Sequence, residues 1–321
     1  MKGDSQSPGR EATRTPSPGT LAAPRSREDT SPMQIAVASG KGGTGKTTVA
    51  TGLALVAAER RRVQFLDCDV EAPNAHVFLS PQWVERQPVT VPAPEVDAST
   101  CTHCGTCARV CAFGAVAVVP NHVMILPQLC HGCGGCIRFC PTGAMREVQR
   151  KIGTLEKGTV GTMLFAHGVL EVGEAISSPL IAAVRAAVHP AADLVLVDAP
   201  PGTSCPVLHA INGVDYCLLV TEPTPFGMHD LDLAVQAVSR LGIPAGVLIN
   251  RADVGDDRVE RYCRQRGLPV LMRIPWDAHL AQLYAQGRPV VRLPRWRDRF
   301  RHLLSSLLYH AEAARREGGN R

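Results

Sequence analysis

A glycine-rich loop, SGKGGTGKTT over residues 39–48, holds the first residues whose types and spacing could do chemistry. It contains the spacing G-x-x-x-x-G-K-T. Glycines let backbone N–H groups turn toward an anion, and a following helix N-terminus adds partial positive charge. We expect the Lys46 amine to reach the β- and γ-phosphates of a nucleotide and the Thr47 hydroxyl to ligate Mg²⁺. The residues predicted to bind the nucleotide here are Gly40, Gly42, Gly43, Thr44, Gly45, Lys46, Thr47 and Thr48.

Eight of the twelve cysteines form two runs with the same spacing, C-x2-C-x2-C-x3-C, and Pro141 follows the second run. This is the pattern of bacterial ferredoxins with two clusters, in which the fourth cysteine of each run ligates the other cluster. Zinc is the alternative, but tetrahedral zinc sites usually pair two C-x2-C knuckles. The pattern predicts one [4Fe–4S] cluster on Cys101, Cys104, Cys107 and Cys140, and a second on Cys130, Cys133, Cys136 and Cys111.

Acidic residues end two of the apolar runs. Asp67 and Asp69 close the run that begins at residue 63, and Asp198 closes residues 194–198. Ligands in open α/β sheets sit at the carboxyl ends of strands. Asp198 is therefore expected to hold the Mg²⁺ shell, and Gly202 in the glycine turn after it can swing its amide toward a γ-phosphate.

Lys41, directly after the first glycine of the loop, narrows the family. The sequence K-G-G-x-G-K-T resembles the deviant Walker A motif of the MinD/ParA ATPases, which include the nitrogenase iron protein. The resemblance extends from Met33 to about Leu293, through LDCDVEAPN, LVDAPPGTSCPV, TEPTPFG and LINRAD. It implies that Lys41 contacts the partner's nucleotide in an ATP-dependent homodimer, as an in-trans cation. It also implies that Asp69, supported by Asp67, positions the attacking water or the Mg²⁺ shell.

Asn250 and Arg251 are predicted to bind the base. The family uses an asparagine at this place, and a carboxamide suits the N6/N7 edge of adenine. The sequence N-[KR]-x-D also resembles the guanine-reading motif of related GTPases, with Asp253 as the reader. The overall resemblance favours ATP.

The remaining cysteines are interpreted differently. Cys68, Cys217 and Cys263 lie in or beside apolar segments and are expected to be buried small residues. Cys205 follows Asp198 at the offset of a cluster-bridging cysteine in the nitrogenase iron protein. No matching second ligand is evident, so an ordinary structural role is favoured.

Composition sets the class of protein. The chain has 321 residues with 45% hydrophobic and 20% charged residues, which indicates about two globular domains. A net charge of +5 is too mild to indicate nucleic acid binding and does not exclude it, and 4% aromatic residues provide no evident platform for stacked bases, so nucleic acid is not the expected partner. The longest apolar runs fall short of a membrane span. Cysteines spaced for metal indicate a reducing compartment, most simply the cytoplasm.

The expected fold is α/β, a doubly wound, mostly parallel P-loop core interrupted by a small ferredoxin-like α+β insert. Strands are expected at residues 33–38, 63–67, 194–198, 216–221 and 245–250, with strand material over 156–170. Helices are expected at 49–59, 177–188 and around Phe300–Leu308, the last packed on the sheet. Residues 81–95, rich in Pro and Val, are interpreted as a linker. The predicted divisions are a disordered tail over 1–32 with Met33 as a possible true start, core residues 33–82, insert 83–151 and core residues 152–321.

Three functions follow. The leading hypothesis is an ATPase whose cycle gates electron transfer from two [4Fe–4S] clusters to an unidentified protein. The second is an ATP-dependent assembly factor that delivers a cluster or metal to an apo-protein. The third is a nucleotide switch in which the clusters are structural. Paired ferredoxin runs enclose their clusters, which favours the first over the second.

Overall fold

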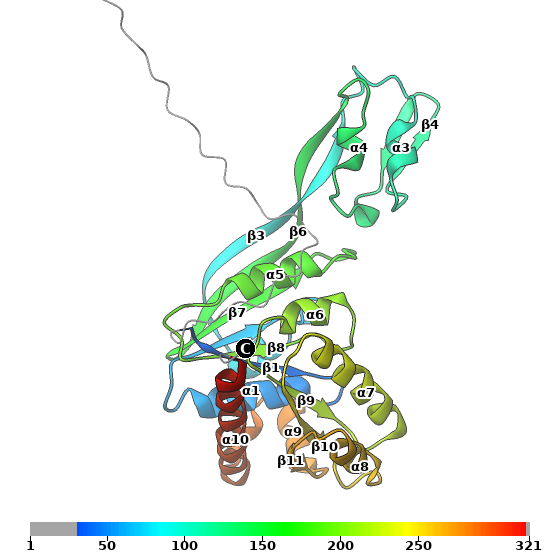
Figure 1. Cartoon of the computed structure of the whole chain (residues 1–321). Helices are drawn as coiled ribbons and strands as arrows, with labels where there is room; N and C mark the ends of the chain where they lie inside the picture. The colour runs from blue at the N-terminus through cyan, green and yellow to red at the C-terminus, as the bar shows by residue number, and fades with distance from the viewer. Residues whose placement is uncertain (1–30, 319–321) are drawn as a thin grey trace, which may run out of the picture.

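A nine-stranded sheet forms the body of the protein, and the computed structural model describes residues 31–318 (Figure 1). Its strand order is β11-β10-β9-β1-β8-β2-β7-β6-β3. The strands from β11 to β7 run parallel, whereas β6 pairs antiparallel with β7, and β3 pairs antiparallel with β6. The prediction of a mostly parallel α/β sheet is confirmed. The strands are β1 Met33–Ala38, β2 Val63–Asp67, β3 Gln82–Val96, β6 Met145–Val160, β7 Met163–Leu170, β8 Leu194–Asp198, β9 Tyr216–Thr221, β10 Ala245–Asn250 and β11 Val270–Ile274.

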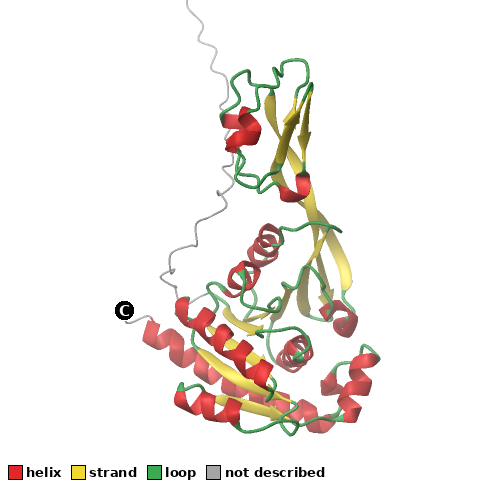
Figure 2. Cartoon of the chain, turned by 90° about the vertical axis from the view of Figure 1, so that its right-hand side faces the viewer, coloured by secondary structure: helices red, strands yellow, loops and turns green. Residues whose placement is uncertain are grey.

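Helices cover both faces of this sheet, as a doubly wound fold requires (Figure 2). Helices α1, α2, α9 and α10 pack on one face, and α5, α6, α7 and α8 pack on the other. Each face therefore buries its own apolar core. The helices are α1 Lys46–Ala57, α2 Ala75–Leu79, α5 Ser178–Ala186, α6 Cys205–Ile211, α7 Pro225–Arg240, α8 Arg258–Gln265, α9 Ala278–Ala285 and α10 Pro294–Gly318.

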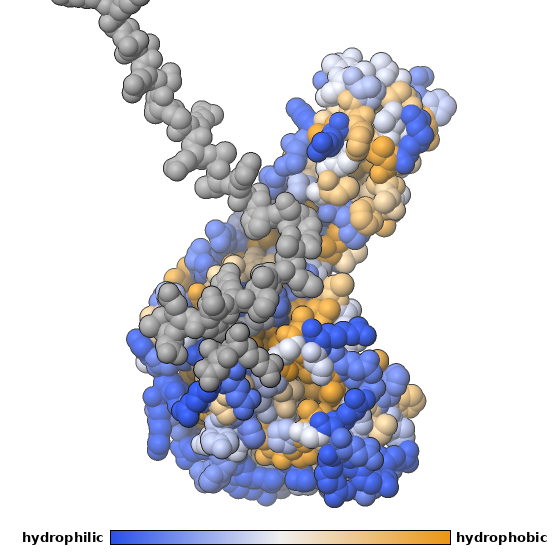
Figure 3. Space-filling model, viewed as in Figure 1, coloured by the Kyte–Doolittle hydropathy of each residue, from blue (hydrophilic) through white to orange (hydrophobic). Residues whose placement is uncertain are grey.

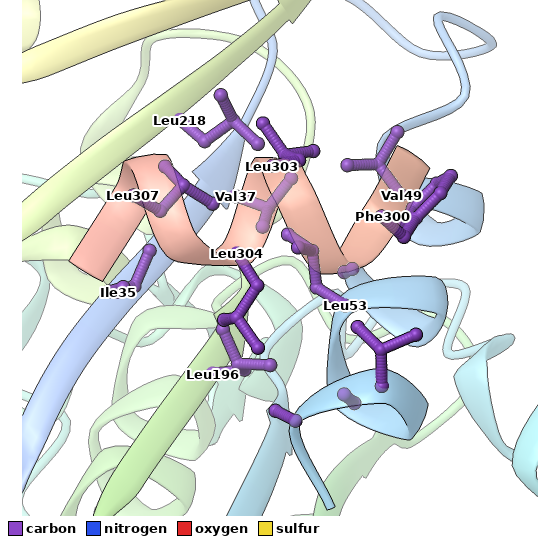
Figure 4. Packing of buried hydrophobic residues seen from close by; sticks show 14 of the residues in the cluster. Ile35, Val37, Val49, Leu53, Leu196, Leu218, Phe300, Leu303, Leu304 and Leu307 are labelled. Carbon is purple, nitrogen blue, oxygen red and sulfur yellow. The ribbon is translucent and has the colours of Figure 1, made fainter. Parts of the chain in front are cut away.

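The C-terminal helix α10 packs on the sheet, as its apolar spacing predicted. Phe300, Leu303 and Leu307 are buried against β1 and α1 (Figure 4). A Cβ atom on Gly52 of α1 would lie 2.6 Å from the Phe300 ring, so only glycine permits this approach of the two helices. Burial of each such side chain is worth about 1.5–3 kcal/mol. Helix α10 thus closes the face of the sheet that carries the phosphate loop.

Strands β3 and β6 form a long antiparallel ribbon that leaves the body and carries the module, residues 97–144, at its far end (Figures 1 and 2). Pairing of β6 with β7 reaches only to Gly153. Beyond it the ribbon continues through residues 90–96 and 145–151, which is roughly 20 Å at about 3.3 Å per residue. The module is therefore held away from the sheet.

The interpretation of residues 81–95 as a linker is wrong, because most of this stretch is strand β3. Its prolines misled the prediction. As the outermost strand of the sheet, β3 tolerates proline, whose missing N–H can face the open edge. Pro88, Pro92 and Pro94 are an even number of residues apart, so their nitrogens face the same side of the strand.

The module is small and built from short elements. Its apolar core has three buried members, Cys107, Val116 and Val123, packed with Met145 of β6, and this core is too small to stabilise a unit of this size without further cross-links. Its cysteines form no disulfides. Apolar surface is exposed on the module (Figure 3), and the side chains of Phe113 and Phe139 are among those exposed. The elements are α3 Thr106–Val110, β4 Val116–Val119, β5 His122–Ile125, η1 Pro127–Leu129 and α4 Gly135–Arg138.

The predicted tail over residues 1–32 falls almost entirely on residues 1–30, which lie outside the described part of the chain. The predicted start at Met33 and the domain divisions at residues 82 and 151 stay predictions. Within residues 31–318, no helix is both long enough and apolar enough to cross a bilayer.

Candidate functional site

The phosphate loop lies between the end of β1 and the start of α1, at the carboxyl edge of the parallel strands. Gly43 and Gly45 have φ of 78° and 93°, a left-handed backbone that favours glycine. Gly40 is needed for a different reason, because a Cβ atom there would lie 2.2 Å from the carbonyl oxygen of Asp230. The loop geometry therefore requires glycine at positions 40, 43 and 45, whereas an added Cβ atom at Gly42 would meet no neighbouring atom.

Lys46 is the first residue of α1, and its side chain is buried at the centre of the loop. Its Nζ donates to Asp198 Oδ1 at 2.6 Å and lies 4.0 Å from Asp69 Oδ2. Burial opposes the charge on Lys46, but the neighbouring carboxylates, Asp198 first, outweigh it and hold the pKa of the amine above its usual range. The amine is thus charged and poised at the loop.

Two buried polar atoms at this site have no partner among the described residues. They are Asp198 Oδ2 and Thr44 Oγ1. Orphaned polar atoms cost free energy unless a ligand or solvent satisfies them. The Lys46 amine that binds Asp198 also lies 3.5 Å from the Thr47 hydroxyl, so the free carboxylate oxygen and this hydroxyl flank one amine and suit Mg²⁺, whereas the free Thr44 hydroxyl in the loop suits a phosphate oxygen. The residues present therefore fit a nucleotide with its metal.

Asp67 and Asp69 occupy the turn at the end of β2. Asp67 is fully buried and accepts hydrogen bonds from the backbone N–H groups of Asp69 and Ala75, both at 3.1 Å. Its carboxylate therefore ties both ends of the loop 68–74, which we call switch I. Burial, with Asp198 nearby, raises the pKa of Asp67 to about 7, and burial raises the pKa of Asp69 to about 6. Asp67 caps the turn, and Asp69 faces Lys46.

The second predicted loop, residues 199–204, is anchored to the first. The amide of Gly202 donates to the carbonyl of Ser39 at 3.0 Å, and Gly202 has φ of 99°. Residue 205 begins α6, and the Cys205 thiol is exposed there. Cys68, Cys217 and Cys263 are buried, as predicted. The loop 199–204 is thus held directly beside the phosphate loop.

The eight module cysteines line two cavities, four to each. One cavity is lined by Cys101, Cys104, Cys107 and Cys140, and the other by Cys111, Cys130, Cys133 and Cys136. Each cavity takes three cysteines from one run and the last cysteine of the other run. This is the division that the ferredoxin spacing predicted. In residues 31–318, no three His, Cys, Asp or Glu side chains converge as a single bound metal ion requires.

The backbones of the two runs repeat each other. Left-handed residues occur at His103 and Gly105 in the first run and at Gly132 and Gly134 in the second. Left-handed residues in such loops turn backbone N–H groups toward a concavity, a geometry found at Fe–S sites. Residues 101–114 and 130–143 therefore present two similar anion-accepting loops, each beside its cavity.

Comparison with known proteins identifies the fold of the nucleotide site. The CobQ/CobB/MinD/ParA nucleotide binding domain family matches residues 35–290. The chain belongs to this family. It is a P-loop ATPase of the MinD/ParA type, and the match covers most of the chain.

Individual relatives add detail. An uncharacterized protein of Methanocaldococcus jannaschii is 36% identical over 222 residues, covering 68% of this chain and 78% of the relative. An iron-sulfur cluster carrier protein of Pyrococcus abyssi is 21% identical over 275 residues, covering 80% and 79%. Among solved structures, the septum site-determining protein MinD with Mg-ADP from Pyrococcus horikoshii has a TM-score of 0.55 at 19% identity, covering 85% of this chain and 95% of that one. The last comparison concerns the fold alone.

Lys41, the residue typical of MinD/ParA ATPases, has a neighbour that sequence reasoning missed. Its Nζ lies 3.5 Å from Glu222 Oε1, and Arg251 Nη1 lies 2.9 Å from the other oxygen of the same carboxylate. The Glu222 side chain is 9% exposed, whereas that of Lys41 is 34% exposed. The sequence signals for Glu222 were its place after the apolar run 216–221 and within the stretch TEPTPFG, and neither indicates a contact with Lys41. In this structure, Lys41 and Arg251 share one acid within the same chain.

The predicted base-binding residues make contacts within the protein. Asn250 Nδ2 donates to the Thr44 carbonyl at 2.8 Å, and its Oδ1 accepts from the Arg251 amide at 3.0 Å. Asp253 Oδ1 accepts from the backbone N–H of Trp276 at 2.6 Å. Asn250 thus braces the phosphate loop from β10, and reading of a base by Asn250 or Asp253 stays a prediction.

Proposed function

We propose that this ATPase uses a nucleotide-driven dimer cycle to gate electron transfer through two [4Fe–4S] clusters to a protein partner. The observation that carries the proposal is the division of eight free cysteines between two cavities, with one ligand exchanged between the runs. Clusters bound there would supply one-electron redox chemistry. The ATPase site would supply the two states that control it.

A second candidate is an ATP-dependent assembly factor that delivers a cluster or a metal. It is supported by two distant relatives, 21% and 22% identical, that are iron-sulfur cluster carrier proteins. The four-cysteine cavities favour retention of the module's clusters, because each cluster would be held by two separate segments of chain. A nucleotide switch with structural clusters is the third candidate, and a lack of redox response to ATP would favour it.

The surface of the module suits a protein partner. Residues 98–144 contain no Asp or Glu, and their charged residues are Arg109 and Arg138. Val110 and Phe113 are exposed and line the cavity of Cys111, whose rim also holds the stacked ring of His131. A partner with apolar and acidic side chains would complement this surface. The ribbon would present the module to it without obstruction from the body.

Dimerisation should depend on both ATP and Lys41. In the Lys41→Ala protein we expect nucleotide binding by one chain to change little, because Lys41 contacts Glu222 and not the cradle of its own loop. The ATP-bound dimer should weaken by about tenfold or more, since a cation would be lost from the partner's phosphates. Light scattering with a non-hydrolysable ATP analogue measures this directly.

The matched variant is Glu222→Gln, which removes the ion pair with Lys41 but keeps the positive charge of Lys41. We expect this variant to dimerise at least as well as the wild type. Equal masses with and without the analogue in the wild type would contradict the dimer cycle. Equal dimerisation of Lys41→Ala and wild type would remove Lys41 from the interface.

The redox proposal is tested by potentiometry. Site-to-site coupling is typically about 1–3 kcal/mol, which corresponds to about 40–130 mV for a one-electron couple. We expect the ATP analogue to shift the cluster potentials by an amount in the lower half of this range. Redox titration followed by EPR, with and without the analogue, measures the shift, and the Lys46→Ala protein is the control. Coincident curves, together with equal protease sensitivity of residues 81–95 in both states, would show that the nucleotide site and the module are uncoupled.

A further inference from the structure

We propose that a row of side chains across the sheet couples switch I to the ribbon, with His167 as the positioning residue between them. The row consists of Asp198, Asp67, His167, Glu156 and Arg86, on β8, β2, β7, β6 and β3. The inference rests on the nucleotide cycle of the proposed function and is independent of whether the clusters carry electrons.

Strand register aligns the five residues. Asp198 is paired with Asp67, Asp67 with His167, His167 with Glu156, and Glu156 with Arg86. Paired residues on neighbouring strands project from the same face of a sheet. The row therefore runs on one face, from the acid that binds Lys46 to the outer edge strand.

A β-bulge completes the row. Trp83 and Arg86 are three residues apart in β3 and would project to opposite faces of a regular strand. The register shifts between Trp83 and Glu85, so both Trp83 and Arg86 share the face of His167. Bulges re-aim side chains in this way. The Trp83 ring stacks on His167 with centroids 4.7 Å apart.

On the side of the row that faces the ribbon, His167, Glu156 and Arg86 are in direct polar contact. His167 Nε2 lies 2.9 Å from Glu156 Oε2, and Arg86 Nε lies 3.1 Å from Glu156 Oε1. Because a carboxylate only accepts, Nε2 carries the hydrogen of that bond. Glu156 thus links a buried histidine of the sheet to an arginine on the ribbon's outer strand.

On the side of the row that faces switch I, buried polar atoms have no hydrogen-bond partner among the described residues. Asp67 binds both ends of switch I, and α2 begins where switch I ends. The His76 ring of α2 meets the His167 ring edge to face, with centroids 5.3 Å apart. Among the described residues, His167 Nδ1, His76 Nδ1 and Asn74 Oδ1 are buried without a partner.

This asymmetry suggests the function of the row. A rearrangement of switch I moves Asp67, Asn74 and His76 together, and two of these residues border His167, because Asp67 is its register partner on β2 and the His76 ring meets its ring edge to face. A new partner for Nδ1 would reorient the ring, and the ring is bonded to Glu156 and stacked on Trp83. Both residues belong to the ribbon strands, so the ribbon would follow the state of the nucleotide.

Hydrogen exchange of the full-length protein with its clusters tests the proposal, with Mg²⁺ and either ADP or a non-hydrolysable ATP analogue. In the wild type, exchange of peptides from residues 82–96 and 145–160 should differ between the two nucleotides by about fivefold or more. In His167→Phe, which keeps an aromatic ring but loses the bond to Glu156, the difference should disappear. Nucleotide affinity should remain within about twofold of the wild type, because His167 does not line the phosphate loop.

Two further variants separate positioning from simple packing. His167→Gln retains a donor for Glu156 and should restore much of the difference. Glu85→Gln is the matched control, because Glu85 pairs with Lys157 at 3.1 Å between the same two strands but on the opposite face. It should behave like the wild type.

The outcomes are decisive for the row. A ribbon difference that persists in His167→Phe, or that is lost equally in Glu85→Gln, would overturn the proposal. If His167→Phe does not fold, Glu156→Leu, which removes the acceptor of the His167 hydrogen bond, must give the same loss, and persistence of the difference in that variant would also overturn the proposal. Failure of the potentiometric experiment with an intact exchange difference would reject the redox function and leave the row in place.

Discussion

The Lys46→Ala protein is expected to lose ATP hydrolysis, with kcat falling by a factor of about 10²–10³ or more. Lys46 is the charged donor at the centre of the loop, and its amine is held by Asp198 in a buried setting. Charge that develops on the phosphate in the transition state would lose its closest preorganised cation. Phosphate release assays and calorimetric titration with ATP measure the loss of turnover and of affinity.

The same substitution should also destabilise the fold. It removes the cation beside Asp198, which is 0% exposed, and breaking a buried ion pair typically costs about 3–5 kcal/mol. Adding Asp198→Asn removes the uncompensated charge and should recover much of that stability. Hydrolysis should stay absent in the double variant, since both phosphate contact and Mg²⁺ ligation are impaired.

This design separates the two effects of Lys46. Lys151→Ala, at a half-exposed lysine of the ribbon, is the control and should leave hydrolysis unchanged. Wild-type turnover in Lys46→Ala would contradict the assignment of the loop. If the wild type bound GTP and did not bind ATP, the base would be assigned as guanine and Asp253 as the residue that recognises it.

Much of the nucleotide site could be predicted because its signals are local. Gly43 and Gly45 are required by the left-handed backbone of the loop itself, and Asp67 and Asp198 each close an apolar strand. The cysteine pattern is also local within each run. Its crossing between runs was predicted from the known geometry of ferredoxin loops, and the two cavities divide the cysteines in the same way.

What sequence reasoning missed depends on contacts between distant segments. Strand β3 is Pro-rich and became a strand only because it is the edge partner of β6, about sixty residues later in the chain. The acid that binds Lys41, Glu222, lies in another βα unit, and its place in the stretch TEPTPFG does not indicate that its side chain reaches Lys41. The cross-sheet row is likewise a product of register, since nothing near His167 in sequence indicates that it lies beside Asp67. Strand β11 and helix α9 also had no prediction.

Removal of a single cysteine, Cys140, is expected to eliminate the cluster of the other run. Anaerobically prepared wild-type protein should contain about eight iron and eight sulfide per chain, the content of two cubanes. Cys140 shares its cavity with Cys101, Cys104 and Cys107, although in sequence it belongs to the second run. The Cys140→Ala protein should therefore retain about four iron, all of it on the second run, since a cubane needs its fourth thiolate.

Double variants reveal which cysteines act together. Cys140→Ala with Cys104→Ala should still retain about four iron, because both ligands belong to one cavity. Cys140→Ala with Cys133→Ala should retain almost none, because each substitution opens a different cavity. Cys205→Ala, on α6, is the control and should keep the full iron content.

The reverse result, with almost no iron in the Cys104 pair and about four in the Cys133 pair, would mean that each run holds its own cluster. Stoichiometric zinc without iron in reconstituted wild-type protein would reject the clusters altogether, and with them the redox function that the module's two cavities support.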